Sequence, residues 1–204
     1  MLHPNQVPDT PNGVDLRVFH PADKPAVRAG LGLPQDAHVL LFTASSIRGN
    51  VWKDYATLQG AVARVADRLK GQPILFIALG EDAPPERIGS AEIRFIPYQE
   101  SSEAVARYYQ AADLYIHAAR ADTFPNTVLE ALACGAPVVA TAVGGIPEQV
   151  KGVQGSRFTV HGSALNTHGT GEATGVLVPP GDADAMAEAI VALLADEPLR
   201  TSLA

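Results

Sequence analysis

Two acidic residues, Asp122 and Glu130, lie on either side of a predicted helix start and are the leading candidates for ligand chemistry. Between them, Pro125 suits the first helical position, because its missing N–H would be unpaired there anyway. That helix would direct the free backbone N–H groups of Asn126 and Thr127 toward an anion. Carboxylates accept hydrogen bonds from hydroxyls, so the pattern suits a ligand with hydroxyls and phosphate. For either acid alone, a solvated acid near a helix N-terminus is the favoured interpretation.

Arg48 and Lys53 are the basic counterpart of these acids. They lie five positions apart in the segment SSIRGNVWKDY, directly after a predicted strand. A guanidinium binds phosphate oxygens as a fork and an ammonium binds them as a point charge, so the pair could clamp a diphosphate. A solvated surface pair is the alternative. The net charge of −7 favours the clamp, because an anionic ligand needs positive charge concentrated locally. Trp52 fits either the wall of this crevice or a core position.

Other candidates also follow predicted strands, whose carboxyl ends bind ligands in doubly wound sheets. Gly144 and Gly145 permit positive φ and close approach of the backbone to a ligand, although a plain tight turn is an equal alternative. His117 ends a buried strand and is more typical of a core histidine than of a site residue. Because parallel strands end at one edge, residues 45–53, Asp122 and the two glycines should share one crevice.

Short apolar runs predict five or six strands, with segments of helical spacing between them. The runs are continuous rather than alternating, as in strands that are covered on both faces. Helical spacing is clear over residues 55–69 and 186–194, and Asp182 suits the N-cap of the second helix. Strands that alternate with helices predict a mostly parallel sheet. The expected fold class is α/β, a doubly wound, Rossmann-like domain, with strands at residues 38–43, 74–79, 92–96, 114–118, 137–141 and 176–178.

Two regions depart from this alternation. Residues 1–37 are rich in proline and predict a linker that leads into a domain over residues 38–204. Residues from about 152 to 174 are rich in Gly, Ser, Thr and His and show little periodicity, which predicts a loop insertion within that domain.

Composition excludes several classes of protein. The net charge of −7 argues against a nucleic-acid partner or a general membrane-surface binder, because both favour a basic face. The single cysteine, Cys134, excludes an internal disulfide and fits a reducing compartment, so a cytoplasmic location is expected. His161 and His168 have no third ligand nearby and support a metal site only weakly. No apolar run approaches the roughly 18 residues of a spanning helix.

Together these segments resemble the glycosyltransferases of family 4, glycogen-synthase-like enzymes with the two-domain GT-B fold. The stretch DTFPNTVLEALACGAPVVATAVGGIPE resembles their E-x7-E region. Upstream, NGVD, FHP and LGLP resemble the segments leading into the family's C-terminal domain, and VLVPPGD resembles its closing motif. The resemblance covers residues 12–150 and 175–195, and implies the C-terminal, nucleotide-sugar-binding half of a GT-B fold.

The resemblance implies a role for each candidate residue. Glu130 would bind the nucleotide ribose, and Asp122, which stands where the family usually has Glu, would contact the donor sugar. Arg48 and Lys53 fall at the family's diphosphate clamp. The remaining residues would contact the base, sugar and phosphate largely through their backbones, and these are Ile96, Pro97, Phe124, Asn126, Thr127, Gly144 and Gly145.

The implied reaction moves a sugar from a UDP- or GDP-sugar to an acceptor with retention at the anomeric carbon. No cofactor or metal is implied, because basic side chains and a helix N-terminus would stabilise the leaving diphosphate. The chain corresponds to one of two domains, so we expect it to be inactive without an N-terminal acceptor-binding domain. An acceptor at the inner membrane face, bound through that domain, fits the same resemblance.

Other functions remain open at this point. The chain could be half of a GT-B-like nucleotide-sugar epimerase, which would need further acids or histidines from the other domain. It could also be a non-catalytic module that binds a nucleotide-sugar. A phosphorylase half has less support, because no lysine lies in a recognisable pyridoxal-binding setting.

Overall fold

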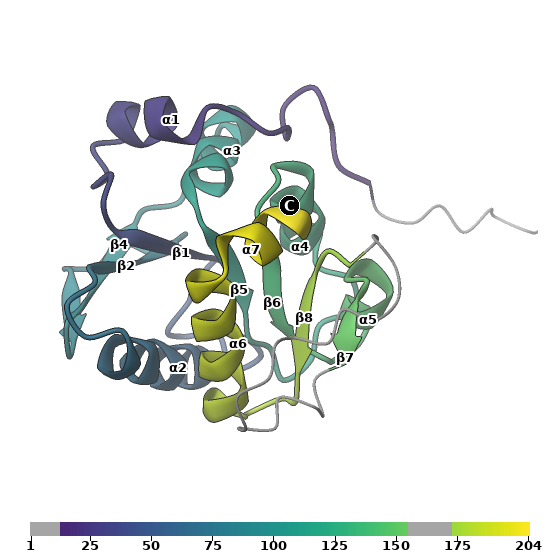
Figure 1. Cartoon of the computed structure of the whole chain (residues 1–204). Coiled ribbons are helices and arrows are strands. Elements are labelled where there is room, and N and C mark those ends of the chain that lie inside the picture. The colour runs from purple at the N-terminus through teal and green to yellow at the C-terminus, as the bar shows by residue number, and fades with distance from the viewer. Residues whose placement is uncertain (1–12, 155–172) are drawn as a thin grey trace, which may run out of the picture.

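A computed structural model describes residues 13–154 and 173–204. Within these residues the chain forms one eight-stranded sheet with helices on both faces (Figure 1). The strands are β1 (His38–Thr43), β2 (Ile74–Leu79), β3 (Glu86–Ile88), β4 (Ala91–Ile96), β5 (Leu114–His117), β6 (Val138–Thr141), β7 (Gly152–Gln154) and β8 (Gly175–Val178).

The strand order is β3-β4-β2-β1-β5-β6-β8-β7, and every neighbouring pair is parallel except β3 and β4. The chain starts at β1 in the middle of the sheet, winds outward to one edge, and returns to β5 on the other side of β1. The predicted doubly wound α/β fold is therefore confirmed. Its point of reversal lies between β1 and β5, which is where ligands bind in sheets of this kind.

Seven helices are described, on both faces of the sheet (Figure 1). Helices α2 and α6 cover one face, and α1, α3 and α4 lie on the other. The predicted N-cap of α6 is confirmed, since the Asp182 carboxylate accepts a hydrogen bond from the Ala185 N–H at 2.8 Å. The helices are α1 (Lys24–Gly30), α2 (Tyr55–Arg68), α3 (Ser102–Ala111), α4 (Asn126–Ala133), α5 (Ile146–Gln149), α6 (Ala183–Ala195) and α7 (Glu197–Ser202).

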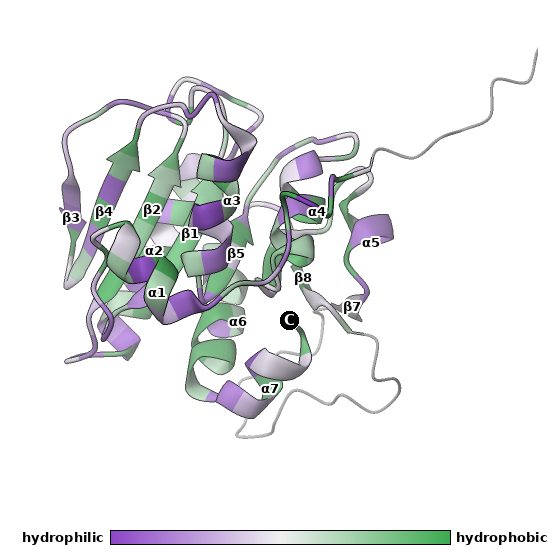
Figure 2. Ribbon diagram, turned by 90° about the horizontal axis from the view of Figure 1, so that it is seen from above, coloured by the Kyte–Doolittle hydropathy of each residue, from purple (hydrophilic) through white to green (hydrophobic). Residues whose placement is uncertain are grey.

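The continuous apolar runs serve two separate cores. In β1, Leu40 and Phe42 join the cluster under α2 and α6, whereas Val39 and Leu41 join the cluster under α3 and α4. Successive side chains of a strand point to opposite faces, so a strand covered on both sides must be apolar at every position. Figure 2 shows this hydropathy in the central strands and the polar character of edge strand β3.

The two edge strands were not predicted from the sequence. Both have three residues, which is too short for a hydrophobic period to stand out. Strand β3 is antiparallel to β4 and is polar. Strand β7 begins where the loop insertion was predicted, so that prediction is wrong for its first three residues, Gly152–Gln154. Residues 155–172, with His161 and His168, lie outside the described residues.

Residues 13–37 pack against the domain, although the sequence predicts a linker there. They contain α1, which Asp23 caps by accepting a hydrogen bond from the third residue of the helix. Phe19, Leu33 and Ala37 are buried in the cluster under α3 and α4. The proline-rich composition concealed a helix of only seven residues, whose sequence signal is weak.

Arg28 is the polar anchor of this segment. Its side chain is buried, and its Nη2 lies 2.8 Å from Oδ2 of Asp113, the residue just before β5. The same guanidinium donates to the carbonyls of Ala111 at 2.9 Å and Ala37 at 3.2 Å. The Asp113 carboxylate also accepts from the Val39 N–H at 2.9 Å. Lys24 of the same helix also pairs with Asp113, at 3.2 Å, so two ion pairs join α1 to the start of the two central strands.

We expect Arg28→Met to lower the free energy of unfolding by about 3 kcal/mol, because it removes the buried cation beside the Asp113 carboxylate and leaves only the more exposed Lys24. Denaturant unfolding measures this loss. Arg17→Met, which breaks the exposed pair with Asp15, is the matched control and should change little. Equal stability of the two variants would show that α1 is not part of the cooperative unit.

Candidate functional site

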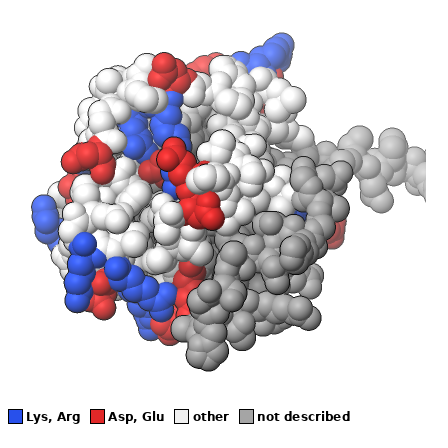
Figure 3. All heavy atoms as spheres, in the orientation of Figure 1, with Lys and Arg blue, Asp and Glu red and all other residues white. Residues whose placement is uncertain are grey.

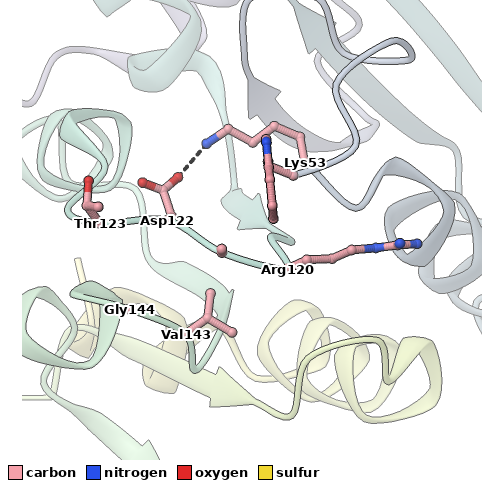
Figure 4. A pocket seen from close by; sticks show the side chains of 8 residues that line it. Lys53, Arg120, Asp122, Thr123, Val143 and Gly144 are labelled. Atoms are coloured by element: carbon pink, nitrogen blue, oxygen red, sulfur yellow. Dashed lines mark hydrogen bonds and ion pairs between the residues drawn. The ribbon is translucent and has the colours of Figure 1, made fainter.

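A cavity of about 580 Å³ opens at the carboxyl ends of β1 and β5, where the strand order reverses (Figure 4). Three loops form it, one after each of the strands β1, β5 and β6. Of the predicted site residues, it contains Lys53, Asp122 and Gly144. The lining residues are Trp52, Lys53, Arg120, Ala121, Asp122, Thr123, Val143 and Gly144.

Lys53 and Asp122 meet at this cavity. The Lys53 Nζ lies 2.5 Å from the Asp122 Oδ2, and both side chains are more than four-fifths buried, with exposed fractions of 18% and 15%. Figure 4 shows the two side chains pointing toward each other, while Arg120 points away. Backbone bonds hold their loops together, because Lys53 bridges to Ala119 and the Arg120 N–H donates to the Trp52 carbonyl at 2.9 Å.

Asp122 is held as a carboxylate. Burial by itself would raise its pKa, but the neighbouring groups, the Lys53 ammonium among them, outweigh burial and lower the pKa to about 2. The His117 ring is fully buried, and its Nε2 lies 3.5 Å from the Asp122 Oδ2. At neutral pH this position therefore presents negative charge that is balanced by a single lysine.

Gly144 and Gly145 are required by the packing of two loops. Gly144 has a φ of +52°, and a Cβ there would lie 1.6 Å from the carbonyl oxygen of Asp122. A Cβ on Gly145 would lie 2.2 Å from the carbonyl oxygen of Thr123, to which the Gly145 N–H donates at 2.8 Å. The glycine pair thus lets the loop after β6 support the loop that carries Asp122, and Gly144 also lines the cavity.

Glu130 lies in α4, is partly buried, and is not among the residues that line the cavity. Its Oε2 accepts a hydrogen bond from the Tyr109 hydroxyl at 2.9 Å. Burial raises the pKa of Glu130, and the bond from Tyr109 partly opposes this rise. The plainer interpretation of Glu130 as a solvated helix residue is therefore wrong, because the carboxylate has a buried partner on another helix.

Helix α4 starts one residue later than the sequence predicted, because Pro125 was expected to be its first residue. Asn126 is the first helical residue and Pro125 takes the N-cap position, where no side chain caps the helix. The Gln149 amide donates to the Pro125 carbonyl at 3.0 Å and so ties α5 to this helix start. Thr127 lies beside the buried Tyr115 hydroxyl and opposes the rise in the Tyr115 pKa that burial causes. Phe124, like Asn126 and Thr127, is not among the residues that line the cavity.

Arg48 does not meet Lys53 in this structure. Its Nε lies 2.5 Å from Glu81, its Nη1 lies 3.5 Å from Glu86, and its guanidinium stacks 5.0 Å from the ring centre of Phe95. Glu81 follows β2, Glu86 begins β3 and Phe95 lies in β4, so the side chain turns toward the other half of the sheet. The predicted Arg48–Lys53 clamp therefore stays a prediction for the ligand-bound state.

The backbone groups predicted to meet the base are engaged elsewhere. The Ile96 carbonyl accepts from the N–H groups of Gly80 and Glu81 at 2.8 and 3.2 Å. The Pro97 carbonyl accepts from the Gln99 side chain at 2.8 Å. Both residues lie at the correct edge of the sheet, at the end of β4, but neither lines the cavity.

Sequence reasoning missed four lining residues, which are Arg120, Ala121, Thr123 and Val143. Their only signal was adjacency to Asp122 and Gly144. Arg120 is exposed, and its Nη2 lies 3.7 Å from the buried Asp54 carboxylate. Trp52 lines the cavity and is 61% exposed, so it is not a core residue. Elsewhere acidic and basic side chains are interspersed, as one face shows in Figure 3.

Comparison with known proteins places the chain in a family. The family model of the group 1 glycosyl transferases matches residues 37–196. The chain belongs to this family. It is 36% identical over 164 residues to the D-inositol 3-phosphate glycosyltransferase of Segniliparus rotundus, a match that covers 74% of this chain and 36% of that protein. The chain thus spans about a third of the length of this relative.

Solved structures agree with this assignment. Sucrose-phosphate synthase from Thermosynechococcus elongatus superposes with a TM-score of 0.69 and 28% identity, over 94% of this chain and 44% of that one. Anabaena HepE in complex with UDP-glucose superposes with a TM-score of 0.66 and 21% identity, over 94% and 48%. The fold is therefore that of a GT-B group 1 glycosyltransferase domain. Within the described residues, no helix of this domain has the length and apolar character needed to span a membrane.

Gly144→Ala should destabilise the domain by about 2–4 kcal/mol, because it combines a left-handed backbone with a clash against the Asp122 carbonyl. Gly181→Ala is the matched control, since Gly181 has a φ of +75° but a Cβ added there would meet no atom within 4 Å. That variant should lose only about 1 kcal/mol. Thermal unfolding of both variants distinguishes packing from backbone conformation, and similar losses would contradict the packing role.

Lys53→Gln should raise the pKa of Asp122 above its value of about 2, because burial remains while the cation is lost. The low pKa stabilises the native state above pH 4, and this contribution disappears as the pH falls from about 4 to 2. In Lys53→Gln the loss of native-state stability between pH 4 and pH 2 should be smaller. Carboxyl ¹³C NMR titration measures the pKa. Lys70→Gln, which breaks the exposed pair with Asp67, should leave it unchanged.

Proposed function

We propose that this chain is the donor-binding domain of a retaining glycosyltransferase that moves a sugar from a UDP- or GDP-sugar to an acceptor. The observation that carries the proposal is the Lys53–Asp122 pair in a cavity at the point of strand reversal. Family membership supports transfer of a glycosyl group. HepE, which shares the fold, was solved with UDP-glucose, and this supports a UDP-linked donor.

In this proposal Lys53 faces the diphosphate and Asp122 accepts hydrogen bonds from hydroxyls of the donor sugar. The two side chains already neutralise each other. A ligand phosphate can take the place of the Asp122 carboxylate beside Lys53, and ligand hydroxyls can take the place of the Lys53 ammonium beside Asp122. A carboxylate with a pKa of about 2 is a poor proton acceptor at neutral pH. Asp122 is therefore assigned to binding rather than to proton transfer.

Helix α4 would bind the donor at two places, at the phosphate or sugar and at the ribose. The backbone N–H groups of Asn126 and Thr127 lie at an N-terminus without a side-chain cap and would face phosphate or the edge of the sugar. Glu130, about one turn further along, would accept from the ribose hydroxyls. Arg48 would complete the diphosphate clamp if the ligand draws it from Glu81, since a phosphate group offers it equivalent oxygen acceptors.

We infer that catalysis needs a second domain. The chain spans about a third of the length of its curated relative, and the cavity is built from one sheet edge only. The acceptor would bind on the partner domain, at the inner membrane face or in the cytoplasm. Retention would result from a reaction on the front face of the donor sugar, with no nucleophile supplied by this domain. No metal would be needed, because Lys53, Arg48 and α4 would stabilise the leaving diphosphate.

Calorimetric titration with UDP, GDP and their sugars tests the proposal. Glu130→Ala should weaken nucleotide binding by roughly 1.5–3 kcal/mol, or about 10- to 100-fold, because it removes charge-assisted hydrogen bonds. Glu148→Ala, at an exposed acid of α5, is the control and should bind as the unmodified chain does. The proposal fails if the unmodified chain binds no nucleotide, or if Glu130→Ala binds with unchanged affinity.

A further inference from the structure

A line of buried hydrogen bonds runs through the core from Glu130 to His117. The Tyr109 hydroxyl donates to Glu130 at 2.9 Å and lies 2.9 Å from the Thr43 hydroxyl. Thr43 lies 3.1 Å from the Tyr115 hydroxyl, which in turn lies 3.1 Å from the His117 Nδ1. The proposed function uses only the glutamate of this line.

Four elements contribute to the line, and all of its middle members are buried. Thr43 ends β1, Tyr109 lies on α3, and Tyr115 and His117 lie on β5. Tyr109, Tyr115 and His117 have no exposed surface, and Thr43 is only 6% exposed. Water therefore does not provide alternative partners, so the groups must satisfy one another.

Proton counting gives the line a direction. A carboxylate at Glu130 can only accept, so Tyr109 spends its single proton there. Each of the remaining bonds also needs one proton. Thr43 must then donate to Tyr109, and Tyr115 must donate to Thr43. The Tyr115 oxygen is left to accept, so the proton on His117 must lie on Nδ1.

The other nitrogen of His117 bears out this assignment. A neutral ring with its proton on Nδ1 has a bare Nε2, which is an acceptor. That Nε2 is buried without a hydrogen-bond partner, although the Asp122 Oδ2 lies only 3.5 Å away. Two acceptors facing each other form no hydrogen bond, which accounts for the long contact. Lys53 is then the group that holds Asp122.

We propose that the line from Glu130 through Tyr109, Thr43 and Tyr115 sets the tautomer of His117, and that His117 is thereby a positioning residue for Asp122. While Glu130 is a carboxylate, Nε2 has no proton to offer, and Asp122 keeps lone pairs for ligand hydroxyls.

The line can also run in the opposite direction. When the line takes up one proton, each group passes its own proton to the next, so that Glu130 is neutralised and Nε2 carries a proton. Every bond of the line is then reversed, and the Nε2–H of His117 donates to Asp122. The charge state of one acid of the site therefore decides how firmly the other is held. The significance for donor binding rests on the proposed function, but the tautomer itself does not.

Imidazole ¹⁵N NMR of the ligand-free chain at pH 7 tests the inference, since burial lowers the pKa of His117 and keeps the ring neutral there. The His117 signals are assigned by their absence in His117→Gln. We expect the Nδ1–H tautomer in the unmodified chain. Glu130→Gln, whose amide can donate to Tyr109, should shift the population toward Nε2–H. Glu148→Gln is the control at an exposed acid and should leave the spectrum unchanged.

A second variant locates the coupling in the line. Tyr115→Phe removes one hydroxyl and keeps the ring, so Glu130→Gln added to it should no longer change the His117 shifts. If Tyr115→Phe does not fold, Thr43→Val takes its place, because it removes the hydroxyl next to Tyr115 in the line. An Nε2–H tautomer in the unmodified chain, or identical shifts in Glu130→Gln, would overturn the inference. Absence of nucleotide binding would overturn the proposed function and leave this result standing.

Discussion

The reversal of strand order between β1 and β5 is the constraint on which the rest of the site depends. It separates the loops after these two strands, so that a cavity opens between them at the edge of the sheet. The Lys53–Asp122 pair closes across that gap at 2.5 Å. Opposite charges that are this buried need close partners, and each side chain supplies the other's. The loop after β6, through Gly144, then supports Asp122 from below.

The polar line behind the site explains why buried hydroxyls persist in an otherwise apolar core. Thr43, Tyr109 and Tyr115 lie in or beside the cluster under α3 and α4, where an unpaired hydroxyl would be costly. Each is satisfied by the next, and the line ends on groups of the site at both ends. The line starts at Glu130 and ends at His117, whose Nε2 lies 3.5 Å from the Asp122 Oδ2.

Positive charge is distributed unevenly around the cavity. Lys53 is held inside it by Asp122, Arg120 is exposed at its rim, and Arg48 is paired with two acids near β2 and β4. A ligand phosphate would compete with carboxylates for these cations rather than meet free charge. Under the proposed function, this arrangement would let a chain with a net charge of −7 bind an anion without leaving buried cations unpaired in its absence.

Local sequence determined the elements whose signals are local. The continuous apolar runs predicted β1 and β2 with their observed bounds, because strands buried on both faces admit few polar residues. Asp182 marked the start of α6 through a contact with a residue three positions away. Parallel pairing then placed Lys53, Asp122 and Gly144 at one edge, as expected from where their strands end.

Only the tertiary structure decided which distant groups became partners. Arg48 is drawn to Glu81, 33 positions away, and α1 is anchored through Arg28 to Asp113, 85 positions away. Thr43 meets Tyr109 and Tyr115 across 66 and 72 positions. Such contacts leave no periodic trace in the chain, because they depend on how helices and strands pack and not on the spacing of residues within them.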